Sequence, residues 1–174
     1  PVYVEVWLEK EALAGVLVDV TDEWDVPLMV TRGYPSLSFL HSAAEQIECT
    51  DKPVYLYYFG DHDPSGQDIS RFVRETIEEL APSADLTFER SAVEPWQINL
   101  YDLPTRPTKK TDSRSASFEG ESVEVDAIDP DELRDICRHA IVQHIDDATY
   151  ERMRTVEQAE RETLDSIVTN MGTA

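Results

Sequence analysis

Three acidic side chains stand where two strand-like segments end. Glu9 follows the β-branched segment 2–8, and Asp61 and Asp63 follow the continuous apolar run 54–59. The carboxyl ends of parallel strands meet at one edge of a sheet, so these carboxylates converge if the two segments are neighbours. Converging carboxylates repel one another, and a hard cation with oxygen ligands relieves the repulsion. The pattern predicts that Glu9, Asp61 and Asp63 form a Mg²⁺ or Mn²⁺ site. An Asp-x-Asp pair alone also fits a solvated turn that caps a helix.

The elements that must position these carboxylates alternate between extended and helical patterns. Helical stripes of apolar residues follow Glu9, Ser36 and Gly66, and Ser36 is placed to cap the second helix. We expect strands at residues 2–8, 26–31, 54–59 and 86–88. This order predicts an α/β fold, a Rossmann-like and mostly parallel sheet flanked by helices.

The second half of the chain has a weaker pattern. Prolines, serines and threonines dominate from residue 92, with a possible short strand at 122–125. Apolar residues recur at helical spacing after Asp129-Pro130, and a charged helix is expected from about residue 147 to 168. We therefore divide the chain into a core (1–91), a long loop region with a basic segment (92–128) and a C-terminal helical annex (129–174).

The composition restricts the possible partners. The chain has 36 acidic and 15 basic residues, a formal charge of −21, which repels nucleic acid unless cations or metal ions intervene. A protein that simply coats DNA is therefore disfavoured, and an adaptation to high salt is an alternative reason for the charge. The two cysteines have no motif spacing, and no apolar run approaches the roughly 20 residues of a membrane span. We expect a cytoplasmic protein with no membrane partner.

Basic residues cluster in one part of the acidic chain. Arg106, Lys109, Lys110 and Arg114 lie within nine residues, and Arg32 precedes a glycine turn. These five side chains are candidates for contact with nucleic-acid phosphates beside the metal. A solvated loop is the alternative interpretation of the cluster.

Several other residues have side chains that could take part in chemistry. His62 stands between the two aspartates. If the side chains of Asp61 and Asp63 point the same way, we expect the His62 side chain to point the opposite way. Cys137 and His139 diverge by about 200° on a helix, which argues against a zinc site. Glu124 and Asp126 are possible additions to the acidic cluster, with an exposed strand edge as the alternative.

Three ordered motifs resemble the Toprim domain, most closely that of the A subunit of type IIB topoisomerases. The first is Glu9-Lys10-Glu11. The others are Thr-Arg-Gly-Tyr-Pro-Ser at 31–36 and Gly-Asp-His-Asp-Pro-Ser-Gly-Gln-Asp-Ile at 60–69. The resemblance covers about residues 1–90 and implies that Glu9, Asp61 and Asp63 bind Mg²⁺. It also implies cleavage of DNA phosphodiester bonds, as in a topoisomerase or a nuclease.

The sequence departs from that family in one respect. In type IIB topoisomerases the nucleophilic tyrosine lies on a winged-helix domain before the Toprim domain, and this sequence opens inside its first strand. We nominate none of its seven tyrosines as a nucleophile. The chain is then either a half-site that needs a winged-helix or ATPase partner, or a nuclease that uses a metal-activated water. A non-catalytic Toprim scaffold that binds DNA or a protein is the alternative. A small-molecule phosphohydrolase is a third, less supported class.

Overall fold

The computed structural model describes residues 1–108, 118 and 120–172. The chain forms two compact units, Pro1–Ile141 and Val142–Ala174. The first unit contains the sheet and the predicted site. The second contains one long helix, α6.

The sheet of the first unit has four strands, all parallel, in the order β2-β1-β3-β4. The expected α/β class with a parallel sheet is therefore confirmed. Strand β1 pairs along its whole length with β3, and the last residues, Leu8 and Phe59, are partners. The two segments that precede the predicted site are thus neighbours, as the metal hypothesis requires. The strands are β1 (Tyr3–Leu8), β2 (Leu28–Val30), β3 (Val54–Phe59) and β4 (Leu86–Ala92).

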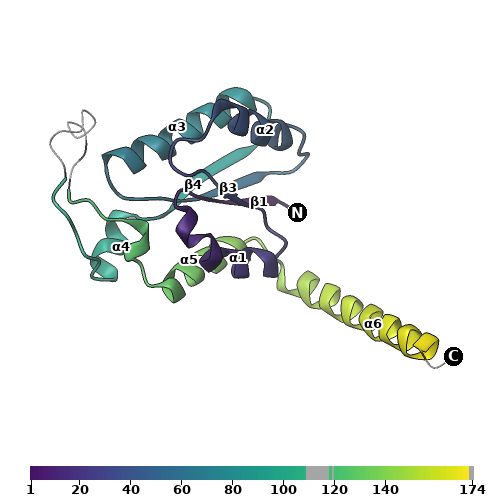
Figure 1. Ribbon diagram of the computed structural model, residues 1–174. Helices are drawn as coiled ribbons and strands as arrows, with labels where there is room; N and C mark the ends of the chain where they lie inside the picture. Colours follow the sequence, from purple (N-terminus) through teal and green to yellow (C-terminus); the bar gives the residue numbers. More distant parts are fainter. Residues whose placement is uncertain (109–117, 119, 173–174) are drawn as a thin grey trace. The chain divides into compact units, whose positions relative to one another are not determined.

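Helices cover both faces of the sheet (Figure 1). Helices α2 (Leu37–Glu48) and α3 (Pro64–Leu80) pack on one face, and α1 (Ala14–Glu23) and α5 (Pro130–Val142) lie on the other. On the α2–α3 face, Trp7 is fully buried in the main core cluster. Strand β3 is almost wholly buried because both of its faces are covered and both of its edges are paired.

Local signals set the helix boundaries. The Ser36 side chain accepts a hydrogen bond from the Phe39 amide, as expected for the cap of α2. Asp63 caps α3, and Pro64 occupies its first turn. Leu37 is 66% exposed because it opens the first turn of α2, and Leu80 is exposed at the last residue of α3.

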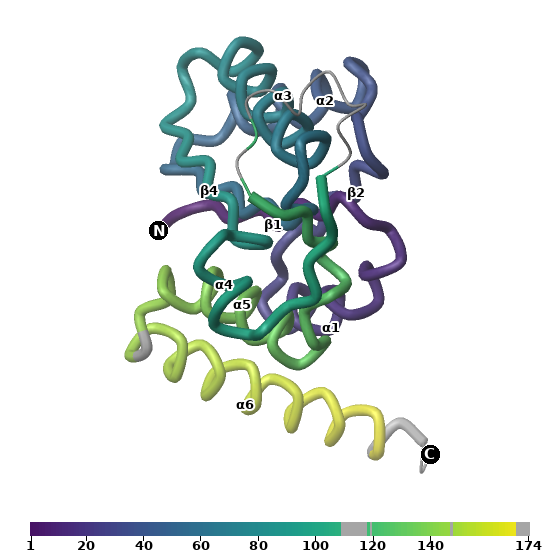
Figure 2. The backbone as a smooth tube through the Cα atoms, turned by 90° about the vertical axis from the view of Figure 1, so that its left-hand side faces the viewer, coloured from purple at the N-terminus to yellow at the C-terminus, as the bar shows by residue number. Residues whose placement is uncertain are grey.

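The region expected to be a long loop contains structure. Helix α4 (Pro95–Leu100) starts at a proline behind a Glu94–Gln97 capping box, and a 3₁₀ turn, η3, spans Val125–Ala127. Instead of a strand, residues 122–125 contribute single bridges, of Arg106 with Ser122 and of His62 with Val123. Figure 2 shows the segments around 106 and 122 running side by side.

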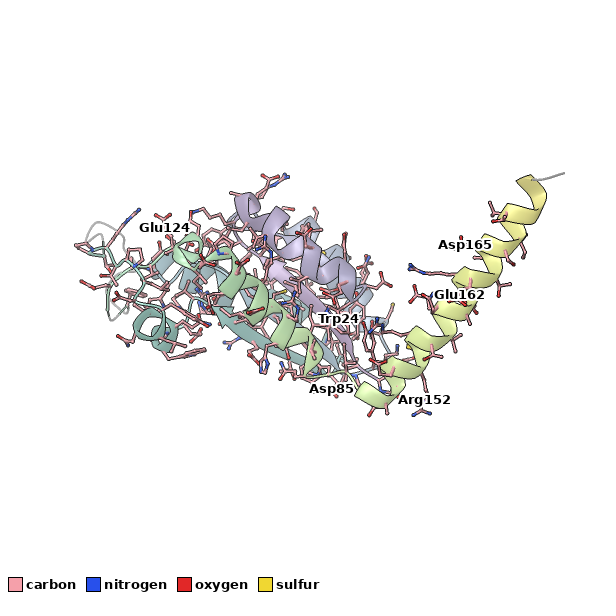
Figure 3. All side chains as sticks on the ribbon, turned by 90° about the horizontal axis from the view of Figure 1, so that it is seen from below. Trp24, Asp85, Glu124, Arg152, Glu162 and Asp165 are labelled. Carbon is pink, nitrogen blue, oxygen red and sulfur yellow. The ribbon has the colours of Figure 1, made fainter. Side chains whose placement is uncertain are left out.

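The second unit is dominated by helix α6 (Asp147–Gly172), which extends a few residues past the end expected for the charged helix. Charged side chains project from it (Figure 3), and several apolar ones, including Met153 and Leu164, are also exposed. Among the helices of the described residues, none is both long and apolar enough to cross a membrane.

Candidate functional site

The pairing of β1 with β3 brings Glu9 and Asp61 together. The Glu9 amide donates to the Phe59 carbonyl at 2.8 Å, which holds Glu9 beside the end of β3. The Asp61 amide in turn faces Oε2 of Glu9 at 3.4 Å. A Cβ atom on Gly60 would lie 2.5 Å from the same Oε2, so glycine is needed for this approach.

The turn that carries both aspartates is fixed by hydrogen bonds. Oδ1 of Asp61 accepts from the Val125 amide at 2.8 Å, and Oδ1 of Asp63 accepts from the Gly66 amide at 2.7 Å. A Cβ atom on Gly66 would lie 2.2 Å from the Asp61 carbonyl oxygen, so α3 starts directly against the turn. Asp63 therefore does perform the helix-capping role that the Asp-x-Asp spacing left open.

The electrostatic environment disfavours negative charge on Glu9 and Asp61. Burial, and next the charge of Asp61, raise the pKa of Glu9 to about 7. Burial also raises the pKa of Asp61, and the charge of Asp63 acts in the same direction, although the bond from Val125 opposes the shift. Partly buried carboxylates close to one another are the environment that a bound cation stabilises.

Arg90 supports the acidic turn and was missed by sequence reasoning. Its guanidinium group donates to the carbonyls of Gly60 at 2.8 Å and Gly66 at 3.3 Å, and also to that of Asp61. The side chain is only 10% exposed, and burial lowers the pKa of Arg90. Its charge in turn lowers the pKa of Glu9. The fourth strand was expected to end at Phe88. An expected strand that continued to Arg90 would have placed this residue at the same edge of the sheet as the acidic turn.

Residues 124–126, which are distant along the chain from the acidic turn, lie on one side of the site. Lys10 contacts Oε2 of Glu124 at 3.2 Å and also pairs with Asp126. The charge of Glu124 contributes to the raised pKa of Asp61, so Glu124 belongs to the same acidic neighbourhood. Figure 3 shows Glu124 and Asp85, which precedes β4, at opposite ends of the first unit.

The predicted phosphate contacts are only partly within the described residues. Arg32 is 69% exposed and pairs with Glu11, and Arg106 is 75% exposed and pairs with Glu124 at 2.5 Å. Arg106 thus reaches the acidic neighbourhood through Glu124. The remaining candidates, Lys109, Lys110 and Arg114, lie outside the described residues.

His62 is buried beside the turn. Its Nδ1 lies 3.2 Å from Nε2 of Gln67, and its ring is 5.1 Å from that of Phe118. Burial, and then the charge of Arg90, lower the pKa of His62. The imidazole therefore favours its neutral form and contacts α3 and Phe118.

The donor chemistry of the carboxylates fits Mg²⁺, because all the ligands are oxygen. In the conformation described, however, no group of three or more His, Cys, Asp or Glu side chains within the described residues is arranged to hold a metal ion. Asp61 and Asp63 each direct one oxygen to a backbone amide. Metal binding by all three carboxylates would therefore require a conformation other than the one described.

Comparison with known proteins does not assign the chain. Neither a scan against protein-family models nor a search of curated proteins found a match.

Proposed function

We propose that this chain is a Mg²⁺-dependent domain of the Toprim kind that acts on DNA phosphodiester bonds. One observation carries the proposal: Glu9 and Asp61 follow neighbouring parallel strands, the Asp61 amide lies 3.4 Å from Oε2 of Glu9, and the pKa values of both carboxyl groups are raised. The three ordered motifs that resemble Toprim supply the family, and the parallel sheet is compatible with it.

Each residue has a defined part in this proposal. The ion, Mg²⁺ or Mn²⁺, is held by Glu9, Asp61 and Asp63. When bound, the ion supplies positive charge for phosphate oxygens and lowers the pKa of a bound water. Arg90 is a positioning residue, because it holds the carbonyls of the turn rather than the substrate. With no nucleophilic tyrosine nominated, the chain works as a nuclease or as a half-site completed by a winged-helix or ATPase partner.

A second candidate function is a non-catalytic Toprim scaffold that binds DNA or a protein partner. Two observations favour it. Asp63 already caps α3, and the described carboxylates are not assembled as a metal-binding group. A scaffold needs the fold and the turn but no bound ion.

Nicking of supercoiled plasmid DNA separates the two functions. We expect nicking in Mg²⁺, none in EDTA, and a loss of at least roughly 100-fold in Glu9→Gln and Asp61→Asn, since each removes a charged ligand. Glu11→Gln is the matched control, because Glu11 is exposed and pairs with Arg32. Nicking that is equal in the wild type and both site variants would contradict the catalytic proposal. Mg²⁺-independent DNA binding without nicking would favour the scaffold.

A further inference from the structure

A pocket of about 640 Å³ lies beside the acidic turn and has no part in the proposed metal chemistry. It is formed by the start of α3, the end of β4 and residue 118, and the described residues that line it belong to the first unit. Its volume falls within the range of roughly 300–1,000 Å³ that is usual for small-ligand sites. The residues that matter here are His62, Gln67, Arg71, Arg74, Arg90 and Phe118.

One part of the pocket is aromatic. The His62 and Phe118 rings lie 5.1 Å apart with a tilt of 54°. Phe88 also lines the pocket and stacks on Tyr58 behind it at 5.8 Å. Planar rings in an open pocket suit a planar ligand, such as a nucleic-acid base.

The other part carries arginines. Among the described residues, three arginines line the pocket beside Asp68 and Glu94. Arg71 pairs with Asp68 and Glu75, and Arg74 pairs with Glu78, so an incoming phosphate competes with these carboxylates. Arg71 and Arg74 are three residues apart and share one face of α3. They are 52% and 48% exposed, and contacts with acidic neighbours one turn away orient them on the helix. They can therefore approach an anion from solvent.

We infer that this pocket binds one unpaired nucleotide of single-stranded DNA. The base lies against Phe118 and His62, and the adjoining phosphates meet Arg71 and Arg74. A duplex is excluded from this mode because its bases are already stacked on both faces. The inference rests on the proposed function for the choice of nucleic acid as ligand. His62 stands between Asp61 and Asp63, so a nucleotide bound here brings the strand to the acidic turn.

Fluorescence anisotropy with a labelled single-stranded oligonucleotide and a matched hairpin duplex tests the pocket, with EDTA present to remove metal. The wild type should prefer the single strand. Arg71→Ala with Arg74→Ala should lower the slope of log affinity against log salt by about 1.4, about 0.7 for each phosphate contact on a single strand. Phe118→Ala should weaken binding about tenfold with little change in slope.

Arg152→Ala with Arg154→Ala is the matched control, since it removes the same charge from exposed positions on α6. This variant should bind like the wild type, and thermal melting checks that every variant folds. The inference is overturned if the wild type binds no single strand or if the pocket variants bind it like the wild type. It is also overturned if the pocket variants lose affinity for the single strand and for the duplex equally. It is also overturned if a nucleoside monophosphate binds as tightly as the oligonucleotide, which would identify a free nucleotide as the ligand.

The same variants separate this inference from the proposed function. Loss of nicking in Glu9→Gln with retained single-strand binding supports both. Pocket-dependent binding without any Mg²⁺-dependent nicking would contradict the catalytic proposal alone. Nicking that survives in pocket variants with unchanged binding would contradict the pocket alone.

Discussion

Two carboxylates of the same strand segment, Glu5 and Glu9, differ in the groups that surround them. Glu5 is 1% exposed, and it accepts hydrogen bonds from Nε1 of Trp7 at 2.7 Å and from the Tyr3 hydroxyl at 3.0 Å. Glu9 faces one amide at 3.4 Å, and its pKa is affected by two like-charged side chains, Asp61 and Asp63, and by the opposite charge of Arg90. Burial raises the pKa of both.

The comparison shows that a raised pKa does not by itself mark a functional carboxylate. Glu5 has two neutral donors that are matched to its two oxygens, so it serves the core. Within the described residues, the donor that faces Glu9 is a single backbone amide, and the charge of Asp61 adds to the effect of burial. A site that gathers like charges needs a cation, whereas a site that gathers donors does not. The two residues should therefore respond differently to substitution.

Glu5→Ala should give the largest effect. It leaves the Trp7 and Tyr3 donors without their acceptor, and the free energy of unfolding should fall by about 3 kcal/mol. Urea denaturation measures the loss. Glu9→Ala in EDTA is the matched control and should lose clearly less. Equal losses in the two variants would remove the distinction between the sites.

The pH dependence of stability should give an intermediate effect. Because the pKa of Glu5 is raised above its ordinary 4.5, the folded state holds this proton more tightly than the unfolded state. The contribution is therefore fully present below pH 4.5 and is lost as the pH rises through the folded pKa. Melting in EDTA should show a decline from pH 4.5 upward that is shallower in Glu5→Gln. Parallel curves for the two proteins would contradict this account of Glu5.

Glu9→Gln should give the smallest effect and the opposite sign. The amide oxygen can still face the Asp61 N–H, and the substitution removes one of the converging charges. In EDTA at about pH 8 the variant should be as stable as the wild type or more stable by up to about 1 kcal/mol. A loss above that size, measured by urea denaturation, would mean that Glu9 is structural like Glu5.

Sequence periodicity predicted the elements that are governed by local physics. The apolar run 54–59 forms the buried strand that its pattern indicates, and Ser36 caps a helix as its type suggests. The meeting of Glu9 with Asp61 followed from a parallel sheet, but only if the two strands were neighbours. Which strands are neighbours is a property of the tertiary structure, so the sequence pattern alone did not decide it.

The unpredicted features depend on contacts between distant segments. Arg90 contacts the turn at Gly60 because β4 continues to Ala92, beyond the expected end at Phe88. The Val125 amide reaches Asp61 across 64 positions, which no periodicity encodes. Helix α4 was locally readable, since Pro95 behind Glu94 is a typical helix start, but the surrounding prolines obscured it.

Thermal melting in Mg²⁺ tests the central claim most directly. An ion that binds only the folded state at about 100 times its Kd stabilises it by about 2.7 kcal/mol, so Mg²⁺ should raise the Tm of the wild type and of Glu5→Gln. Asp61→Asn with Asp63→Asn should abolish the rise, while the asparagine introduced by the second substitution can still cap α3. An equal rise in this double variant, or no rise in the wild type, would contradict a metal site at Glu9, Asp61 and Asp63.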